Sequence, residues 1–140
     1  MVKLTKNFTI EEMVYSPTAE ANKIDNRANV VVIENLKCLC ENVLQPLRDY
    51  LGCAVKVTSG YRSEALNRKI GGVKNSQHKT GKAADIIVPN KKLNDVFEYI
   101  KANLPFDQLL LEHNAYGRWI HVSYDKNKNR KYAVKDYSGS

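Results

Sequence analysis

The sequence predicts an α+β fold in which helices pack on a mostly antiparallel sheet. Helical patterns come first along the chain, and short strand-like runs dominate its second half. Hydrophobic residues make up 43% and charged residues 26% of the 140 residues, as in ordinary globular chains. No repeat is visible, and no apolar stretch approaches the ~20 residues of a membrane helix. We expect one domain, with an N-terminal extension over 1–29 and a basic tail over 125–140.

Helices are expected mainly in the first half of the chain. A capping box at 9–12 predicts a short helix that ends near Pro17. Residues 30–51 then carry apolar side chains at helical spacing. Because proline disrupts a helix interior, Pro46 predicts a kink or a break within this segment. Gly52 is expected to end the helix.

The second half alternates short strands with two further helices. The runs 106–112 and 119–124 flank a polar segment and predict a hairpin. The stretch 73–82 has no periodicity and is expected to be a loop, and 18–29 is a polar segment without an assigned element. The remaining expected elements are strands at 54–58, 83–88 and 131–134 and helices at 63–70 and near 93–104.

Charge and cysteine content limit the kind of partner and compartment. The net charge of +7 favours a polyanionic partner, either nucleic acid or an anionic bacterial wall. No helix-turn-helix, zinc-finger or aromatic RNA-binding signature is present, so nucleic acid is not expected. The N-terminus has no apolar signal-peptide core, and three cysteines do not make a disulfide framework. We expect a cytoplasmic starting point, no membrane partner and a monomer.

Three polar residues form a candidate metal site. His78 lies in an expected loop, Asp85 at the start of an apolar strand, and His121 within a later strand. A catalytic zinc site needs three protein ligands and one open position, and these residue types are suitable ligands. On spacing alone, ordinary core or surface histidines are the favoured interpretation.

Three motifs narrow this choice. Ser76–Asp85 fits the pattern SxHxxGxAxD, Thr58–Ser63 reads TSGYRS, and Trp119–Ser123 reads WIHVS. In this order they resemble the zinc D-alanyl-D-alanine carboxypeptidase family, peptidases that cut D-amino-acid bonds in bacterial peptidoglycan. The small single-domain carboxypeptidase branch is the most similar, and the resemblance extends from 8–12 to Tyr124. It implies a hedgehog/DD-peptidase-like zinc fold.

The resemblance assigns a role to each matching residue. His78, Asp85 and His121 correspond to the three Zn²⁺ ligands. Arg62 corresponds to an arginine that orients substrate through its carboxylate or carbonyl, a task that suits the guanidinium fork. Glycine at 81 is expected to let the backbone turn sharply and approach the metal.

Three further residues are predicted to bind substrate. Ser76 and Gln77 are expected to line the cleft, with a loop-stabilising hydrogen bond as the alternative for both. Trp119 shares a strand face with His121 and is expected to form an apolar wall of the cleft. A core position is the alternative for Trp119.

The general base departs from the pattern of several branches. They carry an acidic residue three positions before the last histidine, where this chain has Arg118. Glu112 is the predicted base, because an expected hairpin brings it near His121. The hedgehog signalling domain, which shares the fold, places a glutamate at a similar point. Asp107 and His113 are the alternatives.

The implied function is zinc-dependent hydrolysis of D-amino-acid-containing bonds in peptidoglycan stem peptides. Glu112 would take a proton from the attacking water and pass it to the leaving amine. A D-Ala-D-Ala carboxypeptidase and a stem-peptide or cross-link endopeptidase both fit, as does a phage or prophage lysin that is released to the wall. The alternative is a catalytically inactive metal-binding module of the same fold, which binds the wall or a protein.

Overall fold

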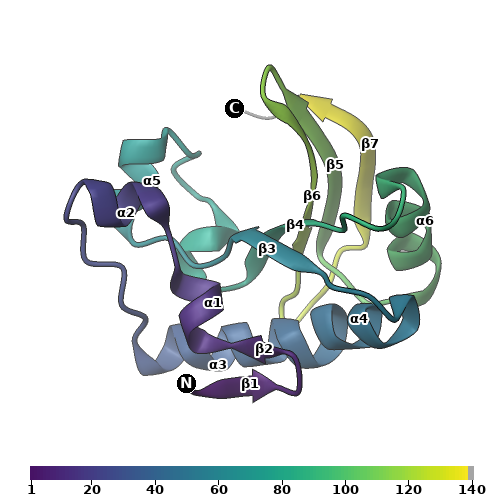
Figure 1. Ribbon diagram of the computed structural model, residues 1–140, viewed down its shortest axis with the longest axis horizontal. Coiled ribbons are helices and arrows are strands. Elements are labelled where there is room, and N and C mark those ends of the chain that lie inside the picture. Colours follow the sequence, from purple (N-terminus) through teal and green to yellow (C-terminus); the bar gives the residue numbers. More distant parts are fainter. Residues whose placement is uncertain (139–140) are drawn as a thin grey trace.

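A five-stranded sheet organises the protein, whose computed structural model describes residues 1–138 (Figure 1). The strand order is β3-β4-β6-β5-β7. All neighbouring strands are antiparallel except β5 and β7, which run parallel. This arrangement confirms the predicted α+β class with a mostly antiparallel sheet. The bounds are β3 (Lys56–Ser59), β4 (Ala83–Ile87), β5 (Gln108–Asn114), β6 (Gly117–Ser123) and β7 (Tyr132–Ser138).

The two faces of this sheet have different chemistry. Alternate residues of a strand point to opposite faces, so the register assigns each side chain to one of them. The core face carries buried aliphatic residues of β4, β5 and β6, namely Ala84, Ile86, Leu109, Leu111, Ile120 and Val122. The intervening positions carry Asp85, Leu110, Glu112, Trp119 and His121, and these face an open cleft.

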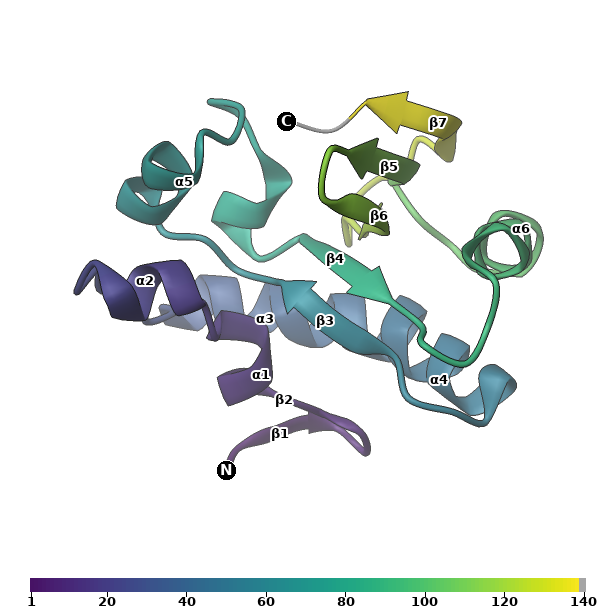
Figure 2. The ribbon, with the colours of Figure 1, turned by 45° about the horizontal axis from the view of Figure 1, so that its top comes forward.

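One long helical run covers the core face of the sheet (Figure 2). It consists of α3 (Val30–Leu39), a π-helical turn (Cys40–Leu44) and α4 (Gln45–Leu51), and Gly52 ends it with a φ of 66°. Where the sequence predicts a kink or break at Pro46, the π-helical turn leads into α4. In this turn the Gln45 N–H donates to the Cys40 carbonyl, five residues back. The wider turn lets the chain continue past a residue that cannot donate a helical hydrogen bond.

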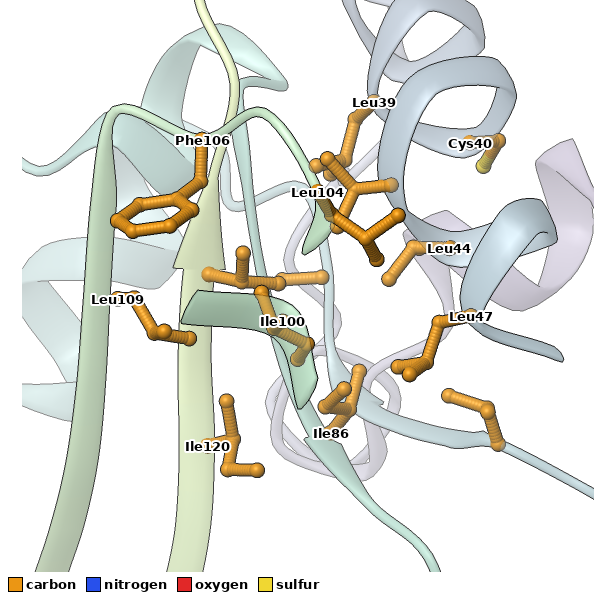
Figure 3. Packing of buried hydrophobic residues seen from close by; sticks show 14 of the residues in the cluster. Leu39, Cys40, Leu44, Leu47, Ile86, Ile100, Leu104, Phe106, Leu109 and Ile120 are labelled. Carbon is orange, nitrogen blue, oxygen red and sulfur yellow. The ribbon is translucent and has the colours of Figure 1, made fainter. Parts of the chain in front are cut away.

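The main core lies between this run, the sheet and α6 (Leu93–Asn103) (Figure 3). Its side chains are large and almost fully buried, which is the main stabilising contribution available to a chain of this size. The residues at its centre are Leu39, Leu44, Leu47, Ile86, Ile100, Phe106, Leu109 and Ile120.

The N-terminal segment packs onto the same core. Its elements are β1 (Lys3–Thr5), β2 (Phe8–Thr9), α1 (Ile10–Val14) and α2 (Pro17–Ala21). Phe8 and Met13 are buried in the core cluster. The helix α2 was not expected within the polar stretch, although Ser16 caps its N-terminus and Pro17 occupies the first turn.

The segment between β3 and β4 contains α5 (Glu64–Ile70) and a 3₁₀ turn (Gln77–Thr80). Gly81 ends the 3₁₀ turn with a φ of 77°, which confirms the expected sharp turn. A Cβ at Gly81 would lie 2.8 Å from the Val32 carbonyl of α3, so glycine also lets that helix approach the turn. Among the described residues, no helix combines the length and apolar character needed to cross a membrane.

Candidate active site

Three predicted ligands converge at the floor of the cleft. His78 lies on the 3₁₀ turn, while Asp85 on β4 is paired directly with His121 on β6. His78 Nε2 is 3.2 Å and His121 Nδ1 is 3.1 Å from Asp85 Oδ1, and the three ligand atoms lie within 4.8 Å of one another. All three residues are buried. Antiparallel pairing of β4 and β6 and the return of the loop onto the sheet therefore create the cluster.

The geometry of this cluster fits a zinc ion. Two ligand atoms bound tetrahedrally at ordinary zinc distances lie roughly 3.4 Å from each other, close to the observed separations. His78 Nδ1 is 2.7 Å from the Gly60 carbonyl, so Nδ1 carries the proton and donates it there. In the neutral ring, Nε2 therefore presents a lone pair to a carboxylate oxygen, an arrangement that a cation between them would stabilise.

The protonation states are also those that bind a metal. Burial lowers the pKa of His78 and so favours its neutral form. Burial by itself would raise the pKa of Asp85, but the neighbouring histidines outweigh that effect and hold the pKa below its ordinary value. Zinc binds neutral imidazole and ionised carboxylate. His78 is thus a neutral ligand and Asp85 an anionic one.

Glu112 stands beside the ligands on the cleft face of β5. Its carboxylate lies 3.8 Å from His121 Nδ1, and its side chain is 14% exposed. Burial raises the pKa of Glu112, and the charge of Asp85 raises it further. A carboxylate whose pKa is moved toward neutrality is suited to accept and then release a proton. The structure places the predicted base directly beside the ligand cluster.

Arg62 is tied to the metal cluster as well as to the cleft. Its Nη2 donates to Asp85 Oδ2 at 3.3 Å, and its Nε donates to Ser59 Oγ at 3.0 Å. The second oxygen of Asp85 is thereby held while the first faces the histidines. A Cβ at Gly72 would approach Asn67 Oδ1 to 2.2 Å, so glycine keeps this pocket open for the guanidinium. Arg62 therefore orients a candidate ligand and also lines the cleft.

The three predicted substrate-binding residues all line the cleft, which has a volume of about 760 Å³. Ser76 also accepts a hydrogen bond from the His78 N–H. Ser76 therefore both lines the cleft and makes a hydrogen bond within the loop. Gln77 Nε2 donates to Asp107 Oδ2 at 2.8 Å. Trp119 Nε1 is buried and has no hydrogen-bond partner within residues 1–138. A volume of this size is typical of sites for substrates larger than a single amino acid.

The two alternatives to Glu112 have other roles in the structure. Asp107 is buried and accepts hydrogen bonds from Arg130 and Gln77, so it is a structural anchor. His113 follows Glu112 in β5, faces away from the cleft and contacts Asp136 at 3.0 Å. Neither residue is among those that line the cleft, where a base would have to act.

Sequence reasoning missed the contribution of the C-terminal segment. Arg130, Tyr132 and Tyr137 line the cleft, although no motif marks them. The expected edge strand at 131–134 exists but continues to Ser138, and there is no loose end within the described residues. The alternation of the sequence alone does not indicate which strand it joins.

The fold and the cluster define a zinc metallopeptidase with two histidine ligands, one carboxylate ligand and an adjacent acid. The chain belongs to the peptidase M15 family, whose model matches residues 6–123. This match confirms the predicted family and, with it, zinc as the cofactor. A comparison with curated proteins gave no match.

Proposed function

We propose that the protein hydrolyses D-amino-acid-containing peptide bonds of peptidoglycan stem peptides. The observation that carries this proposal is the position of Glu112 beside three convergent ligand atoms in an open cleft. The family match supports the peptidase class, and the three sequence motifs support the substrate class. D-Ala-D-Ala carboxypeptidase and stem-peptide or cross-link endopeptidase activities both fit this proposal.

Five residues of the cleft have a defined task in this reaction. His78, Asp85 and His121 would hold the zinc, which when bound supplies a Lewis acid that acidifies water and polarises a carbonyl. Glu112 accepts the proton of the attacking water at its carboxylate and later gives it to the leaving amine. Trp119 forms part of the cleft lining and excludes water on that side.

We also propose that the protein acts on the wall as a monomeric lysin that is released from a phage- or prophage-carrying cell. The net charge of +7 supports this proposal, because a cationic enzyme is retained on an anionic wall polymer.

Digestion of defined peptidoglycan fragments, with products identified by mass spectrometry, tests the function. With zinc present, we expect cleavage of one stem-peptide bond, and a chelator should abolish it. The mass of the products identifies the bond. Stoichiometric zinc binding without any product would contradict the enzyme and favour the inactive binding module.

A further inference from the structure

The strand β7 forms one wall of the cleft, outside the region that the family model matches. The match ends at Ser123, and β7 begins at Tyr132. Even so, Arg130, Tyr132 and Tyr137 line the same cleft as the metal cluster. Figure 1 shows β7 at one edge of the sheet, whereas the segment between α5 and β4, which carries Gln77 and His78, lies away from it on the far side of β6. Residues of both segments line the cleft.

The two tyrosines share the cleft face only because β7 is irregular. Tyr132 is paired with Gln108 and Tyr137 with Glu112, positions of β5 that both face the cleft. Residues five apart in a regular strand would face opposite ways. The register shifts between Leu110 and Glu112, where β7 uses one extra residue, and this brings Tyr137 back to the cleft.

The bulge is held in a conformation that few residues adopt. Asp136 has a φ of 66°, in the left-handed region that is costly for a residue other than glycine. Its carboxylate contacts His113 Nε2 on the face of β5 that is turned away from the cleft. Backbone strain of this kind persists where the surrounding structure or the function maintains it. Here its consequence is the orientation of Tyr137.

Arg130 gives the same wall a fixed cation. Its Nε and Nη2 donate to the two carboxylate oxygens of Asp107 at 2.8 Å each, which immobilises the guanidinium. The side chain of Arg130 is nevertheless 57% exposed, so other N–H groups remain free to bind an acceptor. Tyr132 and Tyr137 are 51% and 43% exposed beside it. Rigid aromatic rings next to an oriented arginine are a favourable surface for binding a peptide chain.

We propose that Tyr132, Tyr137 and Arg130 form a subsite for the part of the substrate remote from the scissile bond. This inference rests on the proposed function and specifies substrate length: a stem peptide of four or five residues, with backbone carbonyl or carboxylate acceptors, rather than a bare dipeptide. The cleft of about 760 Å³ has room for such a chain. Arg130 is unsuitable as a first test, because its loss would also release Asp107.

Calorimetric titration tests the subsite in a zinc-loaded Glu112→Gln background, which prevents turnover. The probes are a five-residue stem peptide that ends in D-alanyl-D-alanine and the acetylated dipeptide alone. We expect the long peptide to bind about 10-fold more tightly than the dipeptide, and Tyr132→Ala or Tyr137→Ala to remove most of this difference. Tyr116→Ala, at the 97% exposed hairpin tip, is the matched control and should change nothing.

A second pair of variants tests the bulge without removing a tyrosine. Because glycine tolerates a positive φ, the Asp136→Gly variant should bind the long peptide as tightly as the parent protein. Because valine is β-branched and does not, the Asp136→Val variant should bind the peptide as weakly as Tyr137→Ala does. Unchanged affinity in Tyr132→Ala and Tyr137→Ala, with cleavage by the wild-type protein intact, would overturn the subsite alone. If the wild-type protein neither cleaves nor binds the stem peptide, the proposed function fails together with the subsite.

Discussion

The carboxylate of Glu112 lies 3.8 Å from Nδ1 of His121, although the two residues are not partners in the β5–β6 ladder. Leu110 is opposite His121, and Glu112 is opposite Trp119, so the contact is a diagonal one across the ladder. Diagonal neighbours on one sheet face are within reach of long side chains. The hairpin thus brings an acid beside the ligand cluster. Arg118, which occupies the position of the acid in several branches, cannot take this role because a guanidinium does not accept a proton.

Replacing Glu112 by glutamine should separate metal binding from turnover. Glutamine keeps the shape of the side chain but cannot accept the proton, so we expect turnover to fall by about 10²–10⁴-fold. Zinc content, measured by atomic spectrometry, should stay near one ion per chain. The matched control is Glu34→Gln on the exposed side of α3, which should retain full activity. Full activity in Glu112→Gln would exclude this residue as the base.

Removing the zinc should lower the thermal stability of the protein. At free zinc about 100-fold above its Kd, binding stabilises the fold by about 2.7 kcal/mol. For a chain of this length, that corresponds to a fall in Tm of roughly 5–10 °C when a chelator is added. Scanning calorimetry with and without chelator measures the shift, and an unchanged Tm would argue against a tightly bound metal.

Substitution of each ligand should remove both zinc and activity. His78→Ala, Asp85→Ala and His121→Ala each delete one of three ligand atoms, so zinc content and peptide cleavage should fall together. The third histidine offers a matched control, because His113 faces away from the cleft. His113→Ala should bind zinc like the wild-type protein, and full zinc occupancy in a ligand variant would remove that residue from the set.

Arg62→Ala should affect the metal as well as the substrate. Because Arg62 donates to Asp85 Oδ2, its loss should weaken zinc binding by about 10-fold or more, as for other groups that orient a ligand. Competition with a chelator of known affinity measures this change. At saturating zinc, a residual rise in KM would show the separate contribution to substrate binding. Zinc affinity and KM that both match the wild-type values would contradict both roles.

Asp107 should control the acid stability of the fold. Hydrogen bonds from Arg130 lower the pKa of Asp107 from 3.8 to about 2. The ionised form is therefore favoured in the folded state. This stabilisation is complete above pH 4 and is lost as the pH falls from about 4 toward 2. It amounts to about 2 kcal/mol at neutral pH, since one pKa unit corresponds to ~1.4 kcal/mol.

Urea unfolding of Asp107→Asn and the wild-type protein checks this expectation. The asparagine variant should be less stable at pH 7 by about 2 kcal/mol, and the difference should shrink as the pH approaches 2. A difference that is independent of pH would mean that lost packing, rather than the carboxylate charge, causes the destabilisation.

Local patterns were enough to predict most of the fold. The capping box at Thr9 and the predicted helix over 63–70 both correspond to observed helices. The alternating runs in the second half correspond to β5 and β6, each extended into the turn by two residues. The π-helical turn before Pro46 and the helix α2 were not predicted, because each depends on how the surrounding backbone accommodates a proline.

The motifs of the sequence were enough to predict the metal ligands and the family, because they specify residue type and order, and the expected hairpin predicted Glu112 as the base. Only the tertiary structure decided that Arg62 holds Asp85, that Asp107 joins Gln77 to Arg130, and that β7 closes the cleft. The face on which Tyr137 lies shows the reason. It depends on parallel pairing with β5 and on one left-handed residue, Asp136, and a strand's own alternation predicts the opposite face.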